Sequence, residues 1–205
     1  MKMPNFRLAG GIVALSLLVP LSVGTSHAQM NPQQPSAKVT AKTSNVALIP
    51  ETTGTSDWVT VLCNNIKTPN MKDLFVTAAL EVGLFTRTQT PPEATARASL
   101  QVRVLRDSQV VLEPGEVAYG RRTQTLRADV PIELQLDTLD AASFSFVDVD
   151  VPVGVHQICA QARVDTGGSG NFSAMGAAGK GTLTVESVRL IKGEDVVLGA
   201  PLSVR

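Results

Sequence analysis

Two aspartates in the second half of the chain have the spacing of a carboxylate pair that could do hydrolytic chemistry. Asp148 and Asp150 are separated by one residue in the alternating run Ser143–Val151. They are predicted to share one strand face, with alpha carbons roughly 6.5–7 Å apart. Glycosidases use two carboxyl groups at about 5–10 Å, but acid pairs are also common on exposed strand faces. We therefore expect a polar sheet edge, with a cation site and catalysis as the alternatives.

His156 is the remaining candidate for acid–base chemistry, because the other histidine, His27, belongs to a predicted leader. A Ser-His-Asp mechanism would also need a serine nucleophile and an orienting acid. The glycine-rich run Gly167–Asn171 lacks the last glycine of a nucleophile elbow and lies in a predicted loop. We expect His156 to satisfy polar groups of a turn.

Neither a metal site nor a cofactor site is predicted. Asp137 and Asp140 could supply calcium ligands, but the loop that alternates acids with glycine is missing around them. The run Gly176–Thr182 differs from a phosphate-binding loop at two positions and precedes a predicted strand instead of a helix. We assign no catalytic, cofactor-binding or metal-binding residue, and enzyme activity stays open, with a non-enzymatic role favoured.

The two cysteines, Cys63 and Cys159, are predicted to form one disulfide, since an even number of cysteines in an exported chain favours pairing. Two separate buried thiols are the alternative. Strand parity places Cys159 with Gln157 and Gln161, on the more polar face of its strand. An immunoglobulin domain instead buries its disulfide against a tryptophan that lies between the cysteines, whereas Trp58 precedes both.

Export is predicted from the first 28 residues. Lys2 and Arg7 precede an apolar core, and small residues lead to a cleavage site after Ala28. The core is about 16 residues long, short of the roughly 20 that a membrane-spanning helix needs, and charges interrupt every later apolar run. We expect a secreted or periplasmic protein with no transmembrane segment after cleavage.

The charge of the chain argues against binding to nucleic acid. The whole sequence has 18 basic and 18 acidic residues. Cleavage removes two basic residues and no acid, which leaves a net charge of −2. Nucleic-acid-binding domains usually have an excess of Lys and Arg on one face, so we expect a protein or a surface polymer as the partner.

Composition divides the remaining chain into a leader and one domain. Residues 29–56 are rich in Gln, Pro, Ser and Thr, which predicts a disordered or loosely attached segment. Residues 46–49 could form a short edge strand within it. From residue 57 to residue 205 the pattern is strand, turn, strand, typical of a single domain.

Alternation with a period of two predicts the fold class. Leu74, Val76 and Ala78 begin one apolar face, while Phe75 and Thr77 begin the opposite one. Several such runs separated by turns, with no capped amphipathic helix, predict an all-β antiparallel β-sandwich of jelly-roll-like or immunoglobulin-like topology. Two irregular stretches are expected, a helical turn over residues 137–142 and a glycine-rich hairpin or loop over residues 166–181.

A set of short motifs resembles uncharacterised exported bacterial β-sandwich proteins that have no assigned activity. The resemblance covers about residues 57–195, and it implies fold and export but no functional residue. It rests on Lys67-Thr68, Lys72-Asp73-Leu74-Phe75, Val102-Arg103-Val104-Leu105, Pro114-Gly115, Gln124-Thr125-Leu126, Ser143-Phe144-Ser145-Phe146, Gly154-Val155-His156 and the ending Gly181-Thr182-Leu183-Thr184-Val185-Glu186-Ser187-Val188-Arg189-Leu190.

Two functions follow as hypotheses. The first is a secreted or periplasmic interaction or structural module, such as a subunit of a surface assembly. The second is an extracellular hydrolase of polysaccharide or ester bonds that would use Asp148 with Asp150, or His156 with a serine. Convergence of these side chains in one concave pocket would favour the hydrolase.

Overall fold

The computed structural model describes residues 38–45, 49 and 54–190. The predicted leader with its cleavage site after Ala28 therefore lies outside the described residues, as do residues 191–205. Within the described part the chain is all-β and contains no helix. No helix there is long and apolar enough to cross a membrane.

Ten strands follow one another along the chain, most of them joined by short turns. They are β1 Val39–Ser44, β2 Gly54–Thr55, β3 Val59–Thr68, β4 Lys72–Thr90, β5 Ala94–Arg106, β6 Val110–Val111, β7 Val117–Leu126, β8 Ile132–Val151, β9 Gly154–Ser169 and β10 Asn171–Val188.

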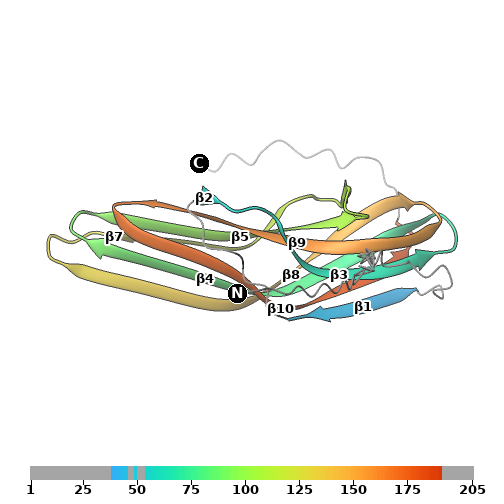
Figure 1. Ribbon diagram of the computed structural model, residues 1–205, viewed down its shortest axis with the longest axis horizontal. Coiled ribbons are helices and arrows are strands. Elements are labelled where there is room, and N and C mark those ends of the chain that lie inside the picture. Colours follow the sequence, from blue (N-terminus) through green and yellow to red (C-terminus); the bar gives the residue numbers. More distant parts are fainter. Residues whose placement is uncertain (1–37, 46–48, 50–53, 191–205) are drawn as a thin grey trace, which may run out of the picture. The chain divides into compact units, whose positions relative to one another are not determined.

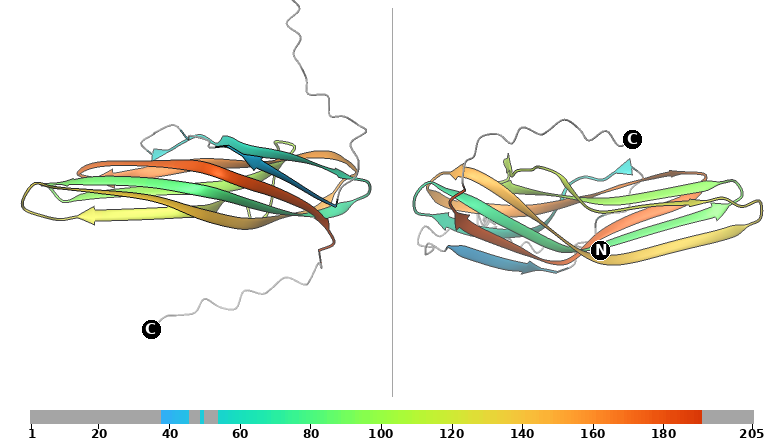
Figure 2. Two further views of the ribbon diagram at one scale, coloured as in Figure 1. Left: turned by 90° about the horizontal axis from the view of Figure 1, so that it is seen from below. Right: turned by 180° about the vertical axis from the view of Figure 1, so that it is seen from behind.

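The strands form two antiparallel sheets that pack face to face (Figures 1 and 2). Sheet A has the order β1-β10-β4-β8. Sheet B contains β9 and β5 at its centre, with β2 and β3 paired to β9, and β6 and β7 paired to β5. The chain changes sheet between β1 and β2, between β3 and β4, between β4 and β5, and at each step from β7 to β10. The antiparallel β-sandwich predicted from the sequence is confirmed.

The core lies between the sheets and follows the predicted alternation. In β4 the residues with even numbers, beginning with Leu74 and Val76, are buried, while Phe75 and Thr77 are only half-buried. From sheet B, β5 contributes Leu100, and its neighbours Val102 and Val104 are also fully buried. Each such side chain stabilises the fold by about 1.5–3 kcal/mol relative to an exposed one.

The expected loose segment over residues 29–56 is corrected at two places. Val39–Ser44 forms β1, which pairs with β10 along the edge of sheet A, and Gly54–Thr55 forms β2. No apolar alternation announces β1, because its inward-facing residues are Thr40, Lys42 and Ser44, opposite buried residues of β10. Backbone hydrogen bonds to β10 keep this strand in the sheet. Composition does not report such bonds, so it did not predict β1. Of the possible edge strand 46–49, residues 46–48 lie outside the described part.

Both stretches expected to be irregular are strand. Residues 137–142 continue β8, where they pair with Leu80–Phe85 of β4. Most of the glycine-rich stretch belongs to β9 and β10, which meet at a turn with Gly170 at φ 71°. The glycines fit because they lie where the backbone or large side chains of the neighbouring strand come close. A Cβ at Gly176 would lie 2.8 Å from a methyl group of Val164.

Candidate functional site

Asp148 and Asp150 do not share a face, which corrects the sequence prediction. The register of β8 against β4 shifts between Lys72 and Leu74, so that β8 has one extra residue at this point. Asp150 takes up the extra length with φ at 53° and donates its backbone N–H to Asp73 at 3.0 Å. As in other β-bulges, the alternation is broken there, which leaves Asp148 buried and Asp150 exposed.

Asp148 faces the core side of sheet A beside Arg106 of sheet B. Its Oδ2 lies 3.3 Å from Nε of Arg106, but this contact lacks hydrogen-bond geometry, and Oδ2 is buried without a hydrogen-bond partner. Burial raises the pKa of Asp148, while the nearby charge of Arg106 lowers it by a smaller amount. The pair links the two sheets at this end of the sandwich.

His156 holds two turns together. Its Nδ1 lies 2.8 Å from Oδ2 of Asp107, and its Nε2 lies 2.9 Å from the carbonyl oxygen of Pro152. The other carboxylate oxygen of Asp107 accepts the backbone N–H of Gln157. Both ring nitrogens are therefore engaged with acceptors of the protein, and the imidazole is only 8% exposed.

These side chains do not converge in one surface hollow of the described part. None of them lines the three surface hollows described for this structure, and the described residues contain no group of three or more His, Cys, Asp or Glu side chains placed to hold a metal ion. The runs that resembled a nucleophile elbow and a phosphate loop lie at the β9–β10 turn and inside β10.

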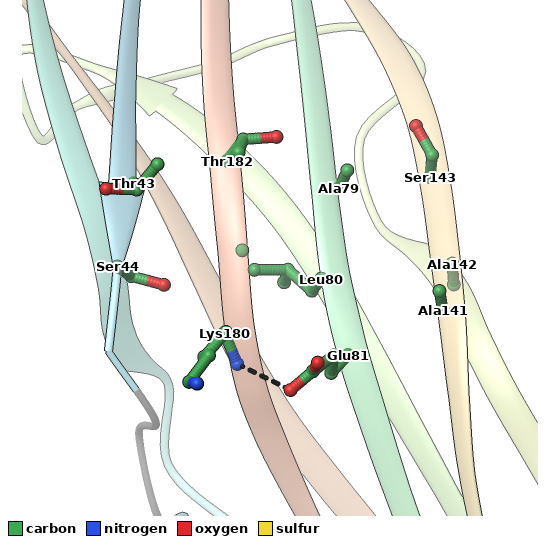
Figure 3. A pocket seen from close by; sticks show the side chains of 11 residues that line it. Thr43, Ser44, Ala79, Leu80, Glu81, Ala141, Ala142, Ser143, Lys180 and Thr182 are labelled. Atoms are coloured by element: carbon green, nitrogen blue, oxygen red, sulfur yellow. Dashed lines mark hydrogen bonds between the residues drawn. The ribbon is translucent and has the colours of Figure 1, made fainter.

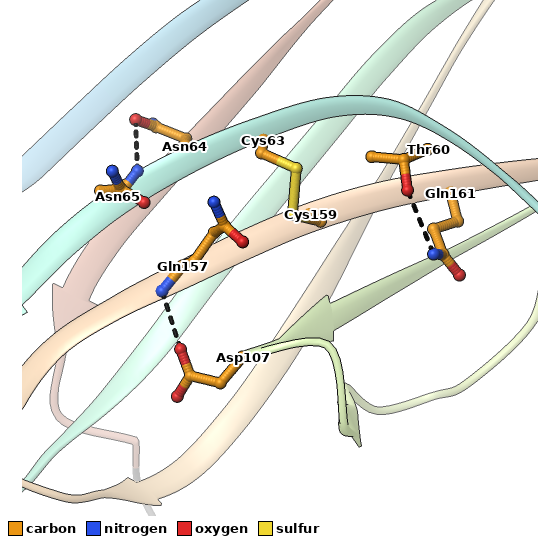
Figure 4. Close-up of a disulfide and its surroundings, with 8 residues drawn as sticks. All are labelled: Thr60, Cys63, Asn64, Asn65, Asp107, Gln157, Cys159 and Gln161. Atoms are coloured by element: carbon orange, nitrogen blue, oxygen red, sulfur yellow. Dashed lines mark hydrogen bonds between the residues drawn. A yellow bond between two sulfur atoms is a disulfide. The ribbon is translucent and has the colours of Figure 1, made fainter. Parts of the chain in front are cut away.

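Cys63 and Cys159 form the predicted disulfide (Figure 4). They lie directly opposite each other on β3 and β9. The outer face of sheet B surrounds them, as the parity argument predicted, and Gln157 and Gln161 are their neighbours along β9 (Figure 4). The bridge thus ties an edge strand of sheet B to a central strand.

A tryptophan between two arginines occupies the same outer face, and sequence reasoning missed it. The guanidinium carbons of Arg103 and Arg163 lie 4.2 and 4.6 Å from the ring centre of Trp58. Arg103 donates to Gln161, and Arg163 donates to Gln101. Because glutamine side chains of the same sheet accept hydrogen bonds from both arginines, the arginines are fixed in place beside the Trp58 ring. The signal in the sequence was a glutamine followed two residues later by an arginine, which occurs at Gln101 and Arg103 and again at Gln161 and Arg163.

A shallow hollow of about 550 Å³ lies on the outer face of sheet A (Figure 3). It exists because the side chains there are small and because β10 bulges between Ala178 and Gly181. The carboxylate of Glu81 accepts the backbone N–H of Lys180 at 3.1 Å (Figure 3). Glu81 thereby satisfies an amide that the bulge removes from the ladder, which is a structural role.

The most distinctive surface is the side of β8 that faces away from β4. Among the described residues, its backbone partner on that side is Glu113 alone, whose N–H and C=O bond to Val147 at 3.0 and 2.9 Å. From Ile132 to Ser145 none of the described strands pairs with this side, and we call this stretch the β8 free edge.

Apolar side chains accompany the β8 free edge on both faces. Ile132, Leu134 and Leu136 face inward, opposite buried residues of β4, yet they remain 43%, 37% and 39% exposed. Phe144 faces inward and is 40% exposed, and Leu139 faces outward and is 71% exposed. These apolar side chains are therefore left uncovered by the described strands, at the edge of the sandwich between β8 and β7.

Comparisons with known proteins add no assignment. No protein-family model matches the chain, and no curated protein matches it. Two solved structures of infectious bursal disease virus are similar to it. The Gx strain structure has a TM-score of 0.31 at 14% identity, covering 75% of this chain and 33% of that one. The Gt strain structure has a TM-score of 0.19 at 11% identity, covering 91% and 49%. This chain thus spans a third to a half of those chains.

Fold and surface together define a disulfide-linked antiparallel β-sandwich with a long open sheet edge along β8.

Proposed function

We propose that this chain is an exported interaction module that binds an extended segment of a protein partner as an additional strand on the β8 free edge. One observation carries this function: a long edge strand on which four inward-facing apolar side chains, those of Ile132, Leu134, Leu136 and Phe144, are more than a third exposed. Export is supported by the leader and by the disulfide, a bond typical of oxidising compartments.

Strand addition fits this surface better than a side-chain site would. An edge strand offers its partner a row of backbone donors and acceptors, and the pockets for alternate side chains supply specificity. Soluble proteins usually blunt such an edge with Lys, Pro or a covering loop. The β8 free edge contains no Lys and no Pro. Of its three acids, Glu133 is paired with Arg87 of β4 at 2.7 Å. Asp137 and Asp140 have no basic residue between them, which favours a partner segment that is apolar with a positive or neutral charge.

The hydrolase alternative has no supporting geometry. His156 uses both ring nitrogens within the fold, and Asp148 is buried against Arg106. Asp150 lies on the bulge, away from the face of Asp148. Hydrolysis would require a general base that can reach the attacking water and an acid that can reach the leaving group. No pair among these residues has that arrangement.

A proline at the edge tests the proposal. Val147 directs its N–H away from β4, so by alternation Leu139 also directs its N–H to the free edge. Leu139→Pro removes that donor and should abolish capture of the partner from the native envelope fraction. Leu139→Thr keeps the donor and should retain most of the capture. Both variants are first checked for an unchanged β-type circular dichroism spectrum.

The comparison between the two variants decides the result. Capture that is lost with proline and kept with threonine supports strand addition. Equal capture by wild type and Leu139→Pro, with the fold intact, would show that the partner does not use this edge. Hydrogen exchange of the complex gives a second readout, since the amides of Ala141 and Ser143 should become protected only if a strand is added.

A further inference from the structure

The chain itself contains a segment with the pattern that the β8 free edge requires. In residues 196–204, every second residue is apolar: Val196, Leu198, Ala200, Leu202 and Val204. This is the period of a strand with one apolar face. Extended, the segment spans roughly 30 Å. It would therefore cover about two thirds of the β8 free edge.

The charges of the two surfaces are compatible. Residues 196–205 contain a single charged side chain, Arg205. On the β8 free edge Glu133 is paired with Arg87, which leaves Asp137 on the outward face and Asp140 on the inward face. A symmetric pair of two β8 edges centred on this stretch would instead bring Asp137 close to Asp137 of the other copy, and Asp140 close to Asp140. Like charges opposite each other destabilise a sheet, so the edge is unsuited to a symmetric pair.

From these observations we propose that residues 196–204 of a second copy of this chain occupy the β8 free edge. The inference rests on the proposed function and names its partner. The five apolar side chains of the segment face inward, where they cover the stretch of β8 from Leu136 to Phe144 at the opening between β8 and β7. The backbone of the segment satisfies the outward-directed groups of β8.

Pro201 sets the direction of the added strand. A proline is accepted at an edge only where its nitrogen faces away from the ladder. On the β8 free edge, the residues that face outward direct their N–H toward the incoming strand. In an antiparallel pair Pro201, which also faces outward, would direct its nitrogen toward β8. In a parallel pair, the inward-facing residues of the added strand direct their backbone nitrogens toward β8. The nitrogen of the outward-facing Pro201 then points away from β8, into solvent. The segment therefore adds parallel to β8.

The same geometry excludes the edge of the segment's own molecule. The backbone N–H of Leu190 bonds to Asp73, which also accepts the N–H of Asp150 near the end of β8. A segment that starts there and returns along β8 runs antiparallel to it, the direction that Pro201 disfavours. It would also have to pass Glu113, which already holds Val147. The donor is therefore another copy.

Donation from one copy to the next is a head-to-tail contact. Donor and acceptor surfaces differ, so the contact does not close on itself unless a ring forms, and it propagates as open chains. We expect light scattering of the purified full chain to give a mass that rises with concentration above that of the monomer.

Full-chain variants of the segment and of the edge separate the donor from the acceptor. Leu198→Lys charges the apolar face of the segment, and its matched control Ser203→Lys charges the opposite face, on which Glu133 and Asp137 of β8 lie. Leu136→Lys places an inward-pointing charge on the acceptor edge, and Leu139→Pro is the second acceptor variant in case the first does not fold. Light scattering should show each donor or acceptor variant as a monomer and Ser203→Lys as an assembly.

Mixing the variants gives the decisive result. The donor variant keeps a working acceptor edge, and the acceptor variant keeps a working segment, so the mixture should form a 1:1 complex and nothing larger. A wild-type chain that stays monomeric at every concentration would overturn the inference. Assembly that Leu139→Pro abolishes but Leu198→Lys leaves intact would also overturn it, while leaving the proposed strand addition in place with a different segment.

Discussion

Folding changes the chemistry of Asp148. Folding buries its carboxyl group beside Arg106 at 3.3 Å without giving Oδ2 a hydrogen bond. Burial raises the pKa of Asp148 above its ordinary value of 3.8, and Arg106 offsets this only in part. A buried ion pair of this kind contributes little to stability, because the loss of hydration opposes the attraction between the charges.

This environment predicts how Asp148→Asn changes the pH dependence of stability. Between pH 3.8 and the raised pKa, the folded chain holds this proton more tightly than the unfolded chain, so the contribution of Asp148 to stability falls as pH rises through that interval. Asparagine does not titrate. The unfolding free energy of wild type minus that of Asp148→Asn should therefore decrease with pH across this window, as measured by urea titration. A difference that increases with pH would contradict the raised pKa.

At the scale of the element, the bulge in β10 determines which glycines are required. A Cβ at Gly181 would lie 2.3 Å from Cδ2 of Leu80 and 2.4 Å from the carbonyl oxygen of Ala79. Because backbone cannot move aside cheaply, this position needs glycine. At Gly83, on the neighbouring strand of the same sheet, the nearest atoms are 3.8 Å away.

The two glycines make a matched pair of variants. Gly181→Ala should destabilise the fold by about 1–3 kcal/mol, the usual range for overpacking. Gly83→Ala should be neutral or slightly stabilising, since alanine restricts the unfolded chain without a clash. Urea unfolding of both variants measures the contrast. Equal stability of the two would show that sheet A adjusts around residue 181.

At the scale of the whole molecule, the disulfide is the one covalent bond between distant parts of the described chain. It joins residues that are 96 positions apart, on strands that are already paired. The chain-entropy description assigns about 4–5 kcal/mol to a loop of this length. The β3–β9 ladder remains when the bond is absent.

We expect the double variant Cys63→Ser with Cys159→Ser to keep its β-sheet spectrum and to unfold at lower urea. The loss of unfolding free energy should reach at most about 4–5 kcal/mol. Intact mass with and without reduction, after alkylation, establishes the bond in the wild type. Two thiols that alkylate freely in the unreduced folded protein would exclude it.

The sequence alone was sufficient for the parts of the structure that depend on local pattern. Alternation at Leu74, Val76 and Ala78 predicts which face of β4 is buried, because a strand places successive side chains on opposite sides. The same parity places Cys159 on the outer face of sheet B. The even number of cysteines predicts their pairing.

Only the tertiary structure decided the features that depend on what lies beside a strand. β1 has polar inward residues and exists through its ladder with β10, which no local pattern shows. Asp148 and Asp150 separate because a bulge interrupts the alternation at that point. The β8 free edge is open because no neighbouring strand covers it, and the apolar pattern of Ile132, Leu134 and Leu136 looks the same in a covered strand as in an open one. Sequence period reports which side of a strand is apolar, whereas only the packing of the sheets determines whether that side is covered.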